Sequence, residues 1–436
     1  MTRPNIVLVT VDSLRADHCG FHGYDRETTP TLDRLADEGL VLENAIAPGP
    51  ATPESMSVVH TGQFLRPYYT GNADVPIIHR RENVRSHLSN HLTIAEALSR
   101  DGYTTLGFSP NPFTSRPFGF QKGFDEYEDF LDSTSRGPTS SIYRRVFERF
   151  IGGDTRLTPI RLLLNWIQRE EMFKSWDQYY EQVVDTVNRV EEPFFLWVFL
   201  LDTHLPYLVG AADRGGLSWL DMWRYNVRLY SSDPAFDDDE LRELIDLYDA
   251  TIRQVDTFID RLQRDLEAYE PTLVFHSDHG EAFGEHGTFG HEPYVYEENI
   301  RVPFLVANGD PSGTVSRPVS LRSIPALIAS LAGVESSFPN LGVVEQEPAD
   351  DIVMSNPLGH RTAMRSRRLK FIRNSDEGRD EMYDLAADHD ERSNLLEGRS
   401  ELANACRAWL RGRQDHETEE LELSRAIGNM IEREEL

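Results

Sequence analysis

Three side chains that can bind a metal ion come shortly after two apolar segments of the chain. Asp12 follows residues 5–11, which are rich in valine and isoleucine, and Asp278 and His279 follow residues 272–275. Two carboxylates and an imidazole suit a divalent cation such as Ca²⁺, Mn²⁺, Mg²⁺ or Zn²⁺. An aspartate at the end of a strand often only caps a turn, so each aspartate taken alone has a simpler interpretation.

Thr52 is the candidate nucleophile. It is followed by Pro53 and Glu54, a pattern typical of a helix start, and Gly62 is placed to end that helix. The threonine either caps the helix or points its hydroxyl at the cation. In the second case, the cation and the helix N-terminus would both lower the hydroxyl pKa and stabilise an alkoxide nucleophile. We therefore expect Asp12, Thr52, Asp278 and His279 to form one site for one divalent metal ion.

Alternating strands and helices would position these residues. Buried strands are predicted at residues 5–11, 40–45, 103–109, 194–201, 272–275 and 302–307. Helices are predicted from Pro30, with Thr29 as N-cap and Gly39 as stop, and at residues 93–100, 176–190 and 239–266. The order predicts an α/β fold, a doubly wound and mostly parallel sheet flanked by helices, with function at the carboxyl ends of its strands.

The pattern of predicted secondary structure changes beyond about residue 345. Short strands at residues 352–355, 362–365, 370–373 and 381–385 predict a small antiparallel sheet, and two acidic helices are expected at roughly 399–412 and 416–434. We expect a catalytic α/β domain at 1–345, in which 115–230 is an insertion that shapes the substrate pocket. Residues 346–436 would form a small C-terminal subdomain with an acidic helical tail.

The net charge of the chain limits the binding partners and the cellular environment that we expect for it. The formal net charge is −29, and only Lys122, Lys174 and Lys370 are lysines among 44 basic residues. Such a composition is typical of a cytoplasmic protein of haloarchaeal type, in which salt screens the repulsion between surface charges. An ordinary acidic protein from a GC-rich genome is the alternative. Because the chain is so acidic, we do not expect it to bind nucleic acid through a basic face.

The cysteines, the N-terminus and the apolar runs give no sign of secretion or of a membrane-spanning segment. The two cysteines, Cys19 and Cys406, do not indicate a disulfide framework. The N-terminus runs directly into a strand without a leader-type segment, and no apolar run reaches the roughly 20 residues that cross a bilayer. We expect a cytoplasmic protein without a membrane span, and the oligomeric state stays open.

The motifs together resemble the sulfatase branch of the alkaline-phosphatase superfamily. The matching segments, in the family's order, are VTVDSLRADHCGFHGY, TPTLDRLADEG, TPESMSVVHTG, LLDTHLPY, FHSDHGEAFGEHGTFGHEPYVYEENIRVP and EMYDLAADHDERSNL. The resemblance implies that Asp12, Thr52, Asp278 and His279 bind the metal. It also implies that His204 and His291 bind ester oxygens or protonate the leaving group, for which histidine is suited near neutral pH. His276 and His286 are interpreted as structural.

The sequence departs from true sulfatases at the nucleophile. Sulfatases carry Cys or Ser there, converted to formylglycine, with a Pro and an Arg nearby, where this chain has Thr52, Glu54 and Met56. Ser13 replaces a second Asp, and residues 108–111 stand where a Lys-x-His segment is expected. Threonine cannot become formylglycine, but it is the nucleophile in related phosphodiesterases and phosphotransferases.

Three functions follow from these observations. The first is a metal-dependent hydrolase of a sulfate or phosphate ester, with Thr52 as nucleophile and a small-molecule, glycan or lipid ester as substrate. The second is a transferase that passes a phosphoalcohol from Thr52 to an acceptor. The third is a non-catalytic binding protein that keeps the fold, which the missing Arg and Lys of the family's pocket would favour.

Overall fold

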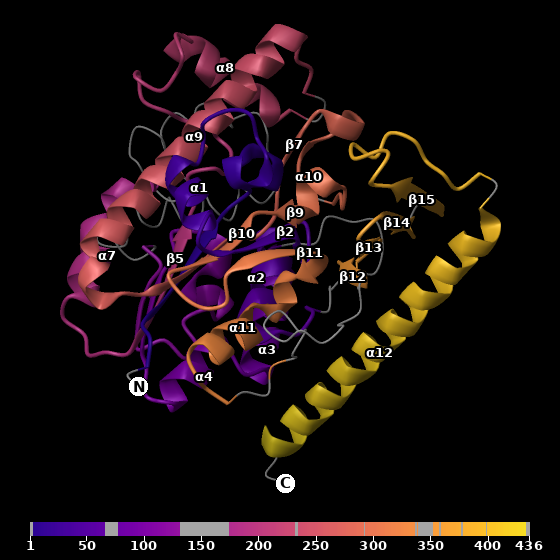
Figure 1. Ribbon diagram of the computed structural model, residues 1–436. Helices are drawn as coiled ribbons and strands as arrows, with labels where there is room; N and C mark the ends of the chain where they lie inside the picture. Colours follow the sequence, from indigo (N-terminus) through magenta and orange to yellow (C-terminus); the bar gives the residue numbers. More distant parts are fainter. Residues whose placement is uncertain are drawn as a thin grey trace.

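A computed structural model shows an α/β fold built on one large sheet (Figure 1). The structure describes residues 3–65, 77–130, 174–231, 234–291, 293–335, 338, 352–356, 359–375, 378–397 and 399–432. Among these residues, nine strands form the large sheet: β1 Ile6–Val11, β2 Leu40–Ile46, β3 Thr104–Phe108, β4 Glu126–Glu128, β5 Phe194–Leu200, β6 Thr272–Ser277, β9 Arg301–Val302, β10 Phe304–Ala307 and β11 Gly313–Ser320.

The sheet is mostly parallel, with β1 at its centre. The strand order is β11-β2-β10-β6-β1-β5-β3-β4, and β9 pairs with β2. The strand β1 runs parallel to both β5 and β6, whereas β10 runs antiparallel to β6 and β2. All six residues of β1 are buried because helices cover both faces of the sheet, which explains its continuous apolar sequence. The predicted fold class is confirmed.

The helices divide between the two faces of the sheet. One core contains Ile6 and Leu8 of β1 and side chains of four helices: α2 Thr52–Thr61, α3 Ile77–Asn90, α4 Ile94–Arg100 and α11 Ile324–Leu331. The opposite core contains Val7 and Val9 and side chains of another four: α1 Pro30–Ala36, α7 Tyr180–Val187, α8 Trp219–Leu229 and α9 Asp238–Asp265. Figure 1 shows these two groups on either side of the sheet.

Several predicted boundaries differ from the observed ones. The first helix ends at Ala36, so Gly39 does not stop it. Gly39 serves a close approach instead, because a Cβ there would lie 2.5 Å from the carbonyl oxygen of Val306 on β10. The helix predicted at residues 176–190 is a short 3-10 helix, Trp176–Gln178, followed by α7. The capping box of Thr93 with Glu96 is present at α4.

The small C-terminal sheet is an antiparallel meander, as predicted. It consists of β12 Ile352–Ser355, β13 Arg361–Ser366, β14 Leu369–Asn374 and β15 Arg379–Asp384. Its apolar face packs with Ala403, Cys406 and Leu410 of α12, and with Val58 of α2. The C-terminal sheet is thereby tied to the helix that begins at Thr52.

The prediction of two C-terminal helices is wrong. One helix, α12 Ser400–Glu432, runs through the predicted break at residues 413–415 and lies along one side of the molecule (Figure 1). The segment contains no proline, and Gly412 faces open space. A single exposed glycine costs a helix only about 1 kcal/mol, which the flanking helix formers offset.

Two further elements lie near the strand ends that carry the candidate site. The hairpin of β7 Ala282–Phe283 and β8 Phe289–Gly290 follows the segment after β6, and α10 Glu297–Ile300 precedes β9. Part of the predicted insertion at 115–230, residues 131–173, lies outside the described residues. Among the described helices, none is long and apolar enough to cross a membrane.

Candidate metal centre and active site

Two neighbouring strands bring Asp12 and Asp278 side by side. The strands β1 and β6 pair in parallel with Val11 opposite Ser277, so the residue after each strand lies at the same edge of the sheet. The amide of Asp278 donates to the carbonyl of Val11 at 3.2 Å, which extends the pairing by one residue. Both carboxyl groups are fully buried.

Polar neighbours hold the two carboxylates in place. Asp12 accepts hydrogen bonds from the Ser13 hydroxyl at 2.9 Å and from the Asn111 side-chain amide at 2.7 Å. Asp278 Oδ1 accepts from the backbone amides of Ser13 at 3.2 Å and of His279 at 2.8 Å. Asp278 Oδ2 is buried and has no hydrogen bond of good geometry to any described residue. One oxygen of Asp278 is therefore held by the backbone, while the other is left to face the site.

His279 presents a lone pair toward these oxygens. Its Nδ1–H donates to the carbonyl of Gly280 at 2.9 Å, which fixes the tautomer and leaves Nε2 free to bind a cation. Nε2 lies 3.7 Å from Asp12 Oδ1 and 3.5 Å from Asp278 Oδ2. Gly280 is required by close packing, since a Cβ there would lie 2.1 Å from the carbonyl oxygen of Glu298.

Thr52 does not cap its helix. The N-cap of α2 is Ala51, and Thr52 is the first helical residue, so the alternative interpretation of Thr52 as a mere cap is wrong. Its Oγ1 instead lies 3.4 Å from His279 Nε2. Ser55, one turn into α2, donates to the carbonyl of Asp278 at 2.7 Å and so fixes the helix start over the site.

Burial leaves this site electrostatically unsatisfied without a cation. Burial, and then the charge of Asp278, raise the pKa of Asp12. Burial raises the pKa of Asp278 to about 6, although the Thr52 hydroxyl lowers it. Burial, followed by the charge of His291, lowers the pKa of His279 to about 4. Two carboxyls that ionise reluctantly and a neutral imidazole would all gain from a bound positive charge.

The donor set fits a divalent metal ion. One ligand atom from each of Asp12, Asp278 and His279 lies within 4.8 Å of the other two, and Asp278 Oδ2 lacks a well-formed hydrogen bond. Two carboxylate oxygens and one imidazole nitrogen, with the Thr52 hydroxyl beside them, match the preferences of several such ions.

Two further histidines stand beside the metal ligands. The ring of His291 lies 4.3 Å from that of His279, and its Nδ1–H donates to Glu281 at 3.2 Å. Burial opposes the ionisation of Glu281, yet His291 holds the pKa of that carboxyl below its usual value. His204 follows β5, and its ring lies 6.0 Å from that of His291. Its Nδ1–H donates to the carbonyl of Leu205 at 2.6 Å, so Nε2 is the ring nitrogen that could contact a substrate.

The structure brings all six candidate residues to the carboxyl-end edge of the sheet. They come from the start of α2 and from the segments after β1, β5, β6 and β8: Asp12, Thr52, His204, Asp278, His279 and His291. The two histidines interpreted as structural lie elsewhere. His276 is buried in β6 and contacts Thr10 at 2.9 Å, and His286 pairs with Glu298 at 2.9 Å.

Sequence reasoning missed three residues of the site. Asn111 lies in the segment that replaces the expected Lys-x-His, and it contacts Asp12 directly. Ser13 adopts a left-handed backbone with φ of 59° and contacts both aspartates, while Glu281 orients His291. For Asn111, the position just after the strand Thr104–Phe108 was the one available signal.

Comparison with known proteins places this site in a family. The family model described as Sulfatase matches residues 4–334, which is most of the chain. The chain belongs to the sulfatase family. A protein named Sulfatase from Formosa agariphila is 24% identical over 442 residues, covering 89% of this chain and 82% of its own. A protein named Arylsulfatase from Clostridium perfringens is 24% identical over 457 residues, covering 90% of each chain.

Solved structures share the fold of this sulfatase-family chain. A 2-O GAG sulfatase superposes with a TM-score of 0.67 at 17% identity, covering 96% of this chain and 94% of its own. The phosphonate monoester hydrolase of Agrobacterium radiobacter superposes with a TM-score of 0.65 at 16% identity, covering 94% and 96%. Homologues in the family are ester hydrolases, and the chain is a sulfatase-family hydrolase of sulfate or phosphate esters.

Proposed function

We propose that Thr52 is the nucleophile of this hydrolase and acts at a single divalent-metal site. The observation that carries the proposal is the position of the Thr52 hydroxyl. It makes no cap for its own helix, and it lies 3.4 Å from His279 Nε2 and near Asp278. A threonine needed only for helix capping would turn its hydroxyl toward the backbone amides of the first turn.

Asp12, Asp278 and His279 would hold the metal ion, with Thr52 as a further ligand. A bound divalent cation would supply positive charge that lowers the pKa of the Thr52 hydroxyl and offsets the charge of the ester oxygens. The N-terminus of α2 acts in the same direction, because its backbone amides favour negative charge at Thr52. The hydroxyl proton leaves to solvent as the alkoxide forms.

The chain's own residues then carry out a two-step displacement. Thr52 Oγ1 forms a bond to the sulfur or phosphorus atom, and the bond to the leaving alcohol oxygen breaks. His204 or His291 gives a proton to that oxygen, and the hydrogen bond from His291 to Glu281 keeps its ring oriented for this task. The histidine that gave up its proton next takes one from a water molecule, whose oxygen attacks the sulfur or phosphorus atom as the bond to Thr52 Oγ1 breaks. Thr52 regains a proton from solvent, and the product is sulfate, phosphate or, from a phosphodiester, a phosphate monoester.

Asn111 would position one of the proposed metal ligands. Its side-chain amide donates to Asp12 Oδ2 at 2.7 Å, so it stands at the rim of the metal ligands. Because threonine has no route to formylglycine, a Thr52-bound ester must be cleared by water rather than by collapse of an aldehyde hydrate. The same two steps can cleave phosphate and sulfate esters. The similar fold of the phosphonate monoester hydrolase supports including both ester classes in the proposal.

The test is a screen of sulfate monoesters, phosphate monoesters and phosphodiesters in high salt, with Mn²⁺, Ca²⁺, Mg²⁺ and Zn²⁺ in turn. High salt is needed because the chain carries a formal net charge of −29. Thr52→Val keeps the shape of the side chain without its hydroxyl, and Thr52→Ser restores a hydroxyl. We expect turnover of one ester class that is lost in the Val variant and retained in part by the Ser variant. Full activity of Thr52→Val would overturn the proposal.

Added alcohols distinguish hydrolysis from transfer in the same assay. If Thr52 passes its group to an acceptor, then alcohols or glycans will divert product from free sulfate or phosphate into a new ester. If the enzyme only hydrolyses the ester, then added alcohols will not change the ratio of free sulfate or phosphate to new ester. Metal content tests the remaining alternative, because a non-catalytic protein would bind no divalent ion on titration.

A further inference from the structure

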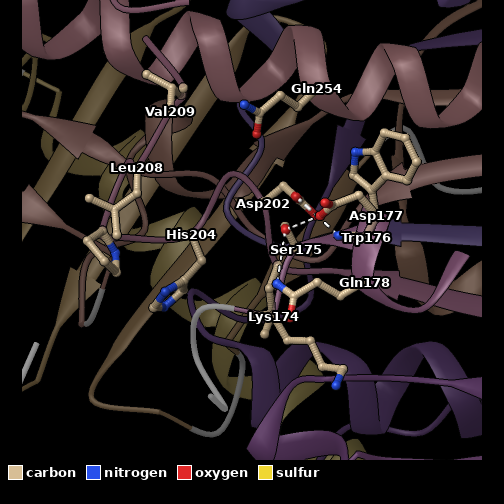
Figure 2. A pocket seen from close by; sticks show the side chains of 13 residues that line it. Lys174, Ser175, Trp176, Asp177, Gln178, Asp202, His204, Leu208, Val209 and Gln254 are labelled. Atoms are coloured by element: carbon tan, nitrogen blue, oxygen red, sulfur yellow. Dashed lines mark hydrogen bonds between the residues drawn. The ribbon is translucent and has the colours of Figure 1, made fainter. Parts of the chain in front are cut away.

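A cavity opens beside His204, and none of the four proposed metal ligands lines it. Its volume is about 440 Å³, and its lining includes Trp176, Asp177, Asp202, His204, Leu208 and Gln254 (Figure 2). His204 connects the cavity to the site, since its ring lies 6.0 Å from that of His291. An ester held at Thr52 with its leaving oxygen near His204 would extend its alcohol portion into this cavity.

Two carboxyl groups at one end of the cavity act on each other. Asp202 Oδ1 accepts a long hydrogen bond, 3.4 Å, from the backbone amide of Trp176. Its Oδ2 is shielded from solvent and has no hydrogen-bond partner among the described residues. Asp177, which is exposed, accepts a hydrogen bond from the Ser175 hydroxyl. Burial raises the pKa of Asp202 to about 7, and the negative charge of Asp177 adds to this shift.

The cation that lines the same cavity does not neutralise these carboxyls. Figure 2 shows the Lys174 side chain extending away from Asp202. Its ammonium lies 4.7 Å from the centre of the Phe130 ring, and Glu128 is the acidic group that acts on it. Among the described residues, Asp177 is the charged group that acts on Asp202, and no cation lowers the pKa of Asp202. The described residues therefore bring no positive charge to the carboxyl end of the cavity.

We propose that this end of the cavity binds a protonated amino group on the alcohol portion of the ester, so that esters of amino alcohols are the preferred substrates. An ammonium offers three donors to oxygens that have few, and its charge removes the repulsion between Asp177 and Asp202. A neutral hydroxyl would supply one donor and no charge. Trp176 and Leu208 provide apolar surface for the carbon skeleton, and Gln254 provides an amide for a ring or chain oxygen. This assignment rests on the proposed function.

Equilibrium binding tests the assignment without requiring turnover. The probes are two matched pairs, glucosamine against glucose and ethanolamine against ethylene glycol. Their binding to the metal-loaded protein is measured by calorimetry in high salt. We expect the amine of at least one pair to bind about ten- to hundredfold more tightly than its neutral partner, because hydrogen bonds between charged groups outweigh neutral ones. The glucosamine pair indicates an amino-sugar ester, and the ethanolamine pair indicates a lipid-headgroup ester.

Two cavity variants and one control variant test whether Asp177 and Asp202 cause the preference for the amine. Asp202→Asn and Asp177→Asn should each abolish most of the preference for the amine, and Asp177 is exposed enough that its replacement leaves folding intact. Asp185→Asn removes an equal charge from an exposed position on α7 and should leave the preference unchanged. Equal binding of amine and neutral partner in both pairs, or a preference that survives both cavity variants, would overturn the inference.

Kinetics separate this inference from the proposed function. For the ester class that the screen identifies, kcat/KM should favour the amino alcohol over the matched neutral alcohol by a similar factor, and Asp177→Asn should remove that factor with little loss on the neutral ester. Thr52→Val should abolish turnover of both esters while leaving amine binding intact. Loss of amine preference with turnover retained contradicts only the cavity assignment, whereas amine binding with full turnover by Thr52→Val contradicts only the nucleophile.

Discussion

Replacing Asp278 by asparagine should stabilise the metal-free protein while removing its response to metal. Burial raises the pKa of Asp278 from 3.8 to about 6 in the folded, metal-free state. One pKa unit corresponds to about 1.4 kcal/mol, so the ionised carboxylate lowers the free energy of unfolding by about 3 kcal/mol at pH 8. The folded state holds this proton more tightly than the unfolded state. This loss of stability is therefore absent below about pH 3.8, grows between pH 3.8 and about 6, and is complete above that.

Asp278→Asn removes the charge but keeps the local structure. An asparagine oxygen in the place of Oδ1 can still accept hydrogen bonds from the amides of Ser13 and His279. We expect the metal-free variant to be about 1–3 kcal/mol more stable than the wild type at pH 8 and indistinguishable from it near pH 4. A metal ion present at 100 times its Kd should stabilise the wild type by about 2.7 kcal/mol and the variant far less.

Urea unfolding in molar KCl, with chelator or with added Mn²⁺, measures both effects. Asp256→Asn is the matched control, because Asp256 is also a buried carboxyl but serves the backbone amides of Thr31 and Leu32. That variant should respond to metal as the wild type does. Equal metal stabilisation of wild type and Asp278→Asn would refute the assignment of Asp278 as a ligand, and a less stable metal-free variant at pH 8 would refute the electrostatic argument.

Three further predictions concern the proton donor, a buried lysine and salt. His204→Gln should slow esters of alkyl alcohols about 100-fold but barely affect 4-nitrophenyl esters, whose leaving group needs no proton; equal slowing of both would contradict the role. Lys370→Met should cost about 3–5 kcal/mol in urea unfolding, because Glu297 and Glu391 contact the buried ammonium at 3.0 and 2.9 Å. Stability measured by thermal unfolding should rise steadily from low to molar KCl, as expected for a net charge of −29, and a flat profile would contradict the halophilic interpretation.

The metal ligands were predictable because strong local signals mark them. Buried and mostly apolar strands precede Asp12 and Asp278, and parallel strands of that kind end at one edge of the sheet. Asn111 escaped prediction because it stands between two prolines in a segment typical of an ordinary turn. Its contact with Asp12 joins residues 99 positions apart, and local sequence carries no record of such a pairing.

Long-range contacts also determine features that local sequence does not specify. The antiparallel direction of β10 depends on its pairing with β6 and β2 rather than on its own four residues. Lys370 is charged yet fully buried in β14, because Glu297 and Glu391 form ion pairs with its ammonium there. The break predicted near Gly412 failed for the opposite reason, since nothing in the tertiary structure interrupts α12 at that point.

The central claim is that Thr52 carries the sulfuryl or phosphoryl group during turnover. The direct measurement is mass spectrometry of acid-quenched protein, mixed for milliseconds with the ester and metal that support activity, followed by peptide mapping. The account predicts one added sulfuryl or phosphoryl group on Thr52, absent from Thr52→Val and cleared when the reaction runs to completion. Rapid turnover with no modified Thr52 at any time, or the same group found on another residue, would contradict it.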